Sequence, residues 1–206
     1  MEFPCQEDKI DSIVEEILSL DNVSEIIYRS YSVGWHDKVI RNILTRPYLK
    51  QIIFYGCFDF IRFDTEEEFP KNSYVEEIKF DLDFLMSFKL WNKLFDALPN
   101  IKKVKMIVDL SWQNEFKESN LLDYIKTISK LKHLKSLNVA ICSRYDEPFD
   151  AKRFGNFPEM ICEINFPMKS EVVIANFPRR IGGQPHDLTN LVEKKEAENP
   201  KIVNCQ

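Results

Sequence analysis

A six-residue phrase recurs along this chain at nearly constant spacing. It consists of an aliphatic residue, two variable residues, a second aliphatic residue, one variable residue and a final apolar residue. The phrases read VSEIIY, LKQIIF, VEEIKF, IKKVKM, LKSLNV and ICEINF, and they begin at Val23, Leu49, Val75, Ile101, Leu134 and Ile161. Their starts are 26, 26, 26, 33 and 27 residues apart. A fixed period of this length predicts a solenoid, in which each repeat stacks on the next.

The phrase itself has the pattern of a strand. Its fourth and sixth residues are apolar and alternate with variable residues, as in a strand with one buried face. Between the phrases, apolar residues recur with the period of a helix, for example from Ile10 to Ile17 and from Leu121 to Leu131. We therefore expect each unit to be a helix followed by a strand, with the strands of successive units side by side in a curved parallel sheet.

The phrase resembles the pattern of leucine-rich-repeat proteins, L-x-x-L-x-L-x-x-N/C. The ninth residues, counted from each phrase start, are Tyr31, Cys57, Asp83, Asp109, Cys142 and Lys169. Two are the cysteine of the family pattern, and two are aspartates that can partly replace its asparagine; the first and last units depart from it. The period near 26 resembles the cysteine-containing subclass found in many F-box proteins. Over about residues 8–170, this resemblance implies an α/β leucine-rich-repeat solenoid of about six helix-strand units.

The sequence divides into two parts. Residues 1–176 are expected to form the repeat domain, with an N-terminal capping helix and a terminal capping strand at VVIANF. Residues 177–206 are expected to be a linker and a mobile or helical tail. The longer fourth interval places its extra residues in DLSWQNEFKESN, where Trp112 and Phe116 either bind a partner or fold back over the neighbouring unit.

Composition narrows the class of protein further. With 206 residues, 44% of them hydrophobic, the chain can bury a continuous core, and its net charge of −5 argues against a strong global attraction to nucleic acid or to anionic membranes. No apolar run approaches the roughly 18 to 20 residues that a membrane span requires. The five cysteines form no C-x-x-C pair, and the N-terminus does not resemble a secretory signal, so we expect reduced thiols and a cytoplasmic or nuclear location.

No catalytic motif accompanies the repeats. The sequence has no glycine-rich phosphate loop, nucleophile elbow or H-E-x-x-H pattern. Asp83 and Asp109, at the same position of adjacent repeats, could share a metal or a proton, but the repeat predicts that they bind loop backbone instead. We therefore expect a non-enzymatic protein without a cofactor or metal.

The strand face turned away from the helices is the predicted binding surface. Several of its residues are apolar where a merely solvated strand would carry polar side chains, and apolar anchors within a charged rim are typical of a protein interface. The alternative is that a loop buries them. The predicted partner-binding residues are Ile27, Arg29, Ile53, Tyr55, Lys79, Asp81, Lys105 and Ile107.

Two other functions remain open beside a protein-protein interaction module. The resemblance implies a substrate-recognition or adaptor component of a ubiquitin ligase, although only about 22 residues precede the first phrase, too few for a three-helix F-box. An RNA-binding or nucleoprotein accessory role would use two groups of lysines, 102, 103 and 105, then 130, 132 and 135. Because no aromatic residue expected to be exposed lies among them, nucleic acid is the less favoured partner.

Overall fold

The computed structural model describes residues 2–5, 10–30, 37–56, 67–82, 88–109, 118–143, 163–167, 171–178 and 201–202. Side chains are described over 10–29, 37–55, 67–80, 88–107, 121–139 and 163–167.

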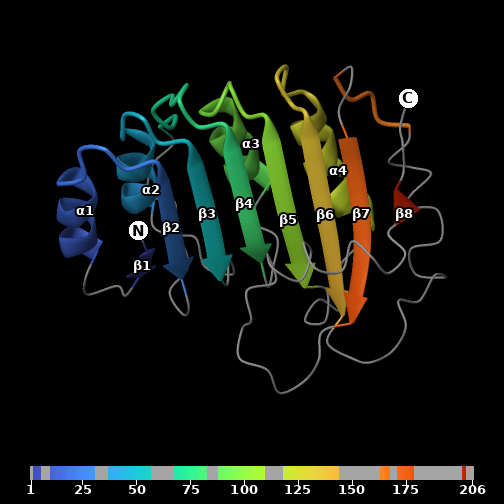
Figure 1. Cartoon of the computed structure of the whole chain (residues 1–206), viewed down its shortest axis with the longest axis horizontal. Coiled ribbons are helices and arrows are strands. Elements are labelled where there is room, and N and C mark those ends of the chain that lie inside the picture. Colours follow the sequence, from blue (N-terminus) through green and yellow to red (C-terminus); the bar gives the residue numbers. More distant parts are fainter. Residues whose placement is uncertain are drawn as a thin grey trace.

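The described strands form one sheet in which their spatial order is their order in the chain. They are β1 (Glu2–Cys5), β2 (Glu25–Ser30), β3 (Gln51–Gly56), β4 (Glu77–Leu82), β5 (Lys103–Asp109), β6 (Ser136–Ser143), β7 (Glu171–Pro178) and β8 (Lys201–Ile202). Neighbouring strands from β1 to β7 are parallel, and β8 pairs with β7 in the antiparallel sense. This order leaves β2 to β7 with a paired neighbour on both sides (Figure 1).

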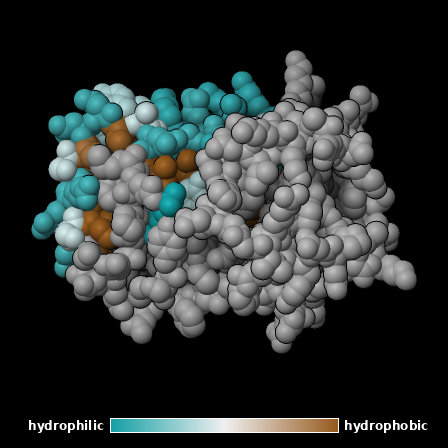
Figure 2. All heavy atoms as spheres, turned by 60° about the horizontal axis from the view of Figure 1, so that its bottom comes forward, coloured by the Kyte–Doolittle hydropathy of each residue, from teal (hydrophilic) through white to brown (hydrophobic). Residues whose placement is uncertain are grey.

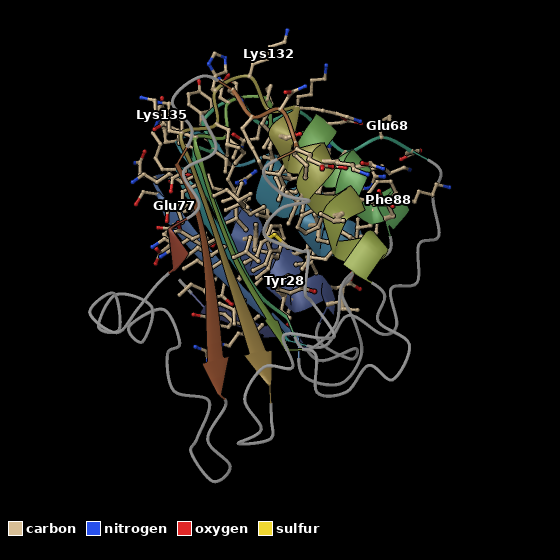
Figure 3. The ribbon with its side chains drawn as sticks, turned by 90° about the vertical axis from the view of Figure 1, so that its right-hand side faces the viewer. Tyr28, Glu68, Glu77, Phe88, Lys132 and Lys135 are labelled. Atoms are coloured by element: carbon tan, nitrogen blue, oxygen red, sulfur yellow. The ribbon has the colours of Figure 1, made fainter. Side chains whose placement is uncertain are left out.

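The described helices cover one face of the sheet. They are α1 (Ile10–Leu18), α2 (Asp37–Leu44), α3 (Phe88–Asp96) and α4 (Glu118–Ser129). Seen along the sheet, they lie together on one side, with Tyr28 pointing toward them and Glu77 on the opposite side (Figure 3). The prediction of an α/β fold with a parallel sheet is confirmed. Parallel strands require long crossover connections, which the helices supply between β1 and β2, β2 and β3, β4 and β5, and β5 and β6.

The sheet register follows the repeated phrase. From β2 to β6 the fourth residues of successive phrases are Cα partners, as are the sixth residues. Both sets are almost completely buried against the helices, as alternation predicts: Ile26, Ile52, Ile78, Val104 and Leu137, then Tyr28, Phe54, Phe80, Met106 and Val139. An aromatic cluster joins sheet and helix, because the Phe80 ring lies 4.7 Å from that of Trp91 and 5.5 Å from that of Phe54.

A pattern of backbone hydrogen bonds also repeats where the strands begin. The carbonyl of the second phrase residue accepts hydrogen bonds from the amides of the second and third residues of the next phrase. Lys50 O, for example, accepts from Glu76 N at 2.9 Å and from Glu77 N at 3.0 Å. Ser24 O, Glu76 O and Lys102 O accept two bonds in the same way. This recurrence fixes the start of every strand from β3 to β6.

The structure corrects the prediction for the sixth phrase. ICEINF was expected to form a strand, but its described residues from Glu163 onward do not, and β7 pairs directly with β6 instead. EVVIANF is rich in β-branched residues, which favour a strand. Ile164 and Phe166 still pack against the core as partly buried side chains.

The described part of the third unit differs from the expected helix followed by a strand. Residues 67–76, which lead into β4, contain no helix. Their fold depends on Asn72, whose buried side-chain amide donates to Leu44 O at 3.0 Å and to Arg46 O at 2.9 Å. Its carbonyl oxygen accepts from Tyr74 N at 2.9 Å, and its own backbone amide donates to Ala97 O at 2.8 Å. One asparagine thus links this segment to the ends of α2 and α3.

Candidate protein-binding surface

The outer face of the sheet is turned away from the four helices. It consists of the third and fifth residues of each phrase and of the residue directly after the phrase, which we count as the seventh position. Sheet register aligns them in three rows across β2 to β6, with neighbouring strands about 4.8 Å apart. The third-position row is Glu25, Gln51, Glu77, Lys103 and Ser136. The fifth is Ile27, Ile53, Lys79, Lys105 and Asn138, and the seventh is Arg29, Tyr55, Asp81, Ile107 and Ala140.

A polar network crosses three of these strands. With the Gln51 amide oriented to satisfy both neighbours, its nitrogen donates to Glu25 Oε2 at 2.8 Å and its oxygen accepts from Lys79 Nζ at 2.9 Å. Lys79 Nζ also lies 3.8 Å from Glu77 Oε1, and both side chains are about one-fifth exposed. Because these groups hold one another in place, Lys79 is a partly buried member of a network rather than a freely solvated lysine.

An apolar and aromatic group lies beside this network on β2 and β3. Ile27 and Ile53 are Cα partners, as are Arg29 and Tyr55 in the next row. The Arg29 guanidinium carbon lies 4.9 Å from the centre of the Tyr55 ring, within cation–π range. Ile27, Arg29 and Tyr55 are half-buried and present part of their surface on the outer face.

Ile53 differs from the prediction of an exposed apolar anchor. Only 7% of its surface is exposed, although it does not belong to the cluster between sheet and helices. Its register neighbours are Ile27 and Lys79, so it lies in the middle of a row rather than at a rim. Ile53 therefore offers a partner little surface of its own and supports the residues around it.

The remaining predicted residues are not part of this group. Ile107 on β5 is separated from Tyr55 by β4, whose Asp81 is the Cα partner of both. Lys105 pairs with Lys79 in the fifth-position row and is half-buried. The Asp81 backbone is in β4, while its side chain lies outside the described residues. The structure thus brings four predicted residues together on β2 and β3 and places Ile107 and Lys105 two strands away from them.

A second surface, which the sequence analysis missed, lies where the strands begin. We call it the basic edge and define it by Tyr48, Lys50, Tyr74, Lys102 and Lys135. The two tyrosines each directly precede a phrase, are 58% and 45% exposed, and have ring centres 5.6 Å apart. Lys50 Nζ lies 5.9 Å from the Tyr74 ring. The sequence analysis did not consider Lys50 or these tyrosines, and comparison of the residue before each phrase could have revealed the tyrosine pair.

The acidic residue of this edge is closely paired. Glu76 Oε1 lies 2.8 Å from Lys102 Nζ and 3.9 Å from Lys50 Nζ. The hydrogen bond from Lys102, aided by the charges of Lys102, Lys50 and Lys135, lowers the pKa of Glu76. Glu76 is therefore ionised in neutral solution and offsets part of the positive charge next to the tyrosines.

The described residues visible in Figure 2 form a mixed surface and not one broad apolar patch. In the view of Figure 2, the described residues along the upper rim are mainly hydrophilic, and apolar residues form small, separate groups among them. Within the described ranges, no helix has both the length and the apolar character needed to cross a bilayer.

The described part of the chain contains no group of three or more histidine, cysteine, aspartate or glutamate residues that could hold a metal ion. Several predicted positions cannot be placed in a site. Cys57, Asp83, Trp112 and Phe116 lie outside the described residues, as do the side chains of Asp109 and Cys142, whose backbones are Cα partners in β5 and β6.

The chain matches no protein-family model, no curated protein and no solved structure. The proposals that follow therefore rest on the residues and geometry of this chain alone.

Proposed function

We propose that this protein is a non-enzymatic interaction module of the leucine-rich-repeat type, which binds a partner protein on the outer face of its sheet. The observation that carries the proposal is the in-register alignment of the phrases from β2 to β6. Because each strand presents its third, fifth and seventh residues at the same height, the chain builds a continuous two-dimensional array of side chains. Arrays of this kind are what repeat proteins use for recognition.

The chemistry of the array favours a protein partner. Arg29 and Tyr55 form a cation–π pair beside Ile27, and arginine and tyrosine are the residue types most often found among interface residues that contribute strongly to affinity. The Glu25–Gln51–Lys79–Glu77 network borders this group with hydrogen-bonding atoms of both signs. A central apolar and aromatic group with a polar rim is the usual composition of a protein interface.

The network also reduces the cost of binding. Side chains that are already held by hydrogen bonds and ring contacts lose less conformational freedom when a partner covers them. The proposed interface is therefore largely formed before the partner arrives. We expect fast association governed by surface charge and an affinity governed mainly by Arg29 and Tyr55.

Comparative affinity capture tests this function. The intact chain, the variant Arg29→Ala/Tyr55→Ala, and the control variant Lys89→Ala/Lys126→Ala, altered on two exposed helix residues, are immobilised and the retained proteins identified by mass spectrometry. We expect the same specific partner with the unmodified chain and the helix control, and at least a 10-fold loss with the outer-face variant. Thermal melts of all three establish that each is folded. Equal retention by a folded outer-face variant would exclude this face as the binding site.

A further inference from the structure

The basic edge has the composition of a surface for single-stranded nucleic acid. We propose that Tyr48 and Tyr74 stack with bases of a single strand while Lys135 of this edge and the adjoining Lys103, the exposed residue next to Lys102, contact its phosphates. This interaction does not depend on the proposed function of the outer face. It would give the protein a second partner at the edge where the strands begin, which adjoins the outer face at Lys103.

Geometry places the aromatic and basic parts along one line. Tyr48 and Tyr74 occupy the same position before β3 and β4, while Lys102 and Lys135 occupy the second phrase position before β5 and β6. Adjacent strands lie about 4.8 Å apart, so the edge from β3 to β6 is about 14 Å long. At the 3.4 Å per nucleotide of one strand in a duplex, that length would span roughly four nucleotides, and an extended single strand would span it with fewer.

The exposure of the tyrosines points to a ligand with planar groups. Of the large hydrophobic side chains whose exposure the structure describes, four are exposed: Leu18, Tyr48, Tyr74 and Phe88. Two of these four meet at one edge, with their ring planes 48° apart rather than stacked flat on each other. Each ring therefore keeps surface on which a base can stack. Bases within a duplex are already stacked on one another, so this chemistry selects single strands.

Tyr48 also adopts a backbone conformation that its own side chain does not favour. Its φ of 64° lies in the left-handed region, where glycine is much less strained than tyrosine. The turn after Pro47 would form at least as readily without the ring. The position of this aromatic group is therefore not explained by the local backbone.

The lysines are available to phosphates. Lys103, Lys130, Lys132 and Lys135 are exposed, and no described acidic side chain forms an ion pair with any of them. Lys132 lies at the top of the molecule in Figure 3, and Lys135 lies at its upper left, on the side of the sheet. Glu76 is held by Lys102 and Lys50, while Asp96 is an exposed acidic residue at the end of α3. Lysines therefore outnumber acidic groups locally, despite the net charge of −5 of the whole chain.

Fluorescence anisotropy with a labelled twelve-residue oligo(dT) and a labelled twelve-residue oligo(U) tests the proposal at several salt concentrations. We expect at least one of the two to bind, more tightly than a labelled duplex of the same length. The logarithm of its association constant should fall with the logarithm of salt concentration, by about 0.7 for each phosphate contact. Comparison of the two probes distinguishes a preference for DNA from one for RNA.

Two variants separate stacking from charge. Tyr48→Gly/Tyr74→Ala should weaken binding by about 10-fold or more with little change in the salt slope, and Tyr48→Gly alone should not lower the melting temperature. Lys103→Ala/Lys135→Ala should reduce the salt slope by about 1.4. The matched controls Phe88→Ala and Lys89→Ala/Lys126→Ala, both away from the basic edge, should bind as the unmodified chain does.

Several results would overturn the proposal. They are no binding of either single strand, binding that the folded tyrosine variant retains in full, and binding lost in the outer-face variant Arg29→Ala/Tyr55→Ala. Labelled poly-glutamate is the remaining comparison. If it binds as tightly as the oligonucleotides, the edge recognises acidic polymers by charge alone, and the assignment to nucleic acid is wrong.

Discussion

The fully buried sixth and fourth phrase residues determine how well each repeat packs. Leu137 on β6 is completely buried between its strand neighbours and the helices. Leu137→Ala should lower the free energy of unfolding by about 2 to 5 kcal/mol, because apolar burial is lost and a cavity is left. Lys103→Ala, on an exposed residue of the neighbouring strand, should change it by less than about 0.5 kcal/mol. Urea melts measure both, and similar losses would show that the assignment of inner and outer residues is wrong.

A second residue-scale prediction concerns alkaline pH. Burial raises the pKa of Tyr124 to about 12, and its ring lies edge-on to that of Trp91 with centres 5.1 Å apart. Because folding favours the protonated phenol, its contribution to stability is complete below about pH 10, the ordinary value, and is lost as the pH rises to about 12. Two pKa units correspond to about 2 to 3 kcal/mol, and the loss should be smaller than this because solvent partly screens the phenol.

The variant Tyr124→Phe isolates that contribution, since it keeps the ring and removes the titrating group. Urea melts of both proteins between pH 9 and pH 12 should show a steeper decline for the unmodified chain. Parallel declines would mean that the Tyr124 phenol titrates alike in the folded and unfolded states.

At the scale of elements, the described segment before β4 shows how one side chain can hold a non-helical segment in place. The Asn72 amide satisfies two carbonyls at the end of α2 and binds the backbone amide of Tyr74. Asn72→Ala would leave these buried groups without partners, and we expect a loss of about 2 to 4 kcal/mol in the free energy of unfolding. Asn100 makes one more exposed bond of this kind, to Ser73 O at 2.8 Å, so Asn100→Ala should cost about 1 kcal/mol or less.

Chemical denaturation of the two asparagine variants, monitored by circular dichroism, provides the comparison. If the Asn72→Ala variant is as stable as Asn100→Ala, then water or other backbone groups form the hydrogen bonds that the Asn72 side chain makes in the unmodified chain. The same comparison concerns the basic edge, because Asn72 holds the backbone of Tyr74 there.

At the scale of the whole molecule, the alternating phrase made most of the sheet predictable. Strand positions β2 to β6 follow from apolar residues at fixed phrase positions, since one buried face requires that alternation. ICEINF satisfies the same pattern and is still not a strand in its described part, so alternation alone does not decide which segment pairs with β6. The short strand β1 contains Pro4 and no clear alternation, so periodicity could not reveal it.

The candidate surfaces were predictable only in part. Phrase positions indicated which residues face outward, and the sheet brings Ile27, Arg29 and Tyr55 together as that pattern implies. That Ile53 is almost completely covered follows from the folded arrangement around it, which spacing along the chain does not give. Tyr48 and Tyr74, whose rings are in contact, each directly precede a phrase. The apolar pattern does not specify the residue type at that position.

Site-specific photo-crosslinking tests the central claim, that the outer face of the sheet binds a partner protein. A benzophenone amino acid replaces Tyr55 on β3 in one protein and Lys126 on α4 in another, and each is irradiated in an extract and its adducts identified by mass spectrometry. The account predicts one dominant protein adduct from position 55, identical to the protein captured by the unmodified chain, and none from position 126. The same adduct from position 126 alone would show that the partner binds the helices and would contradict the account.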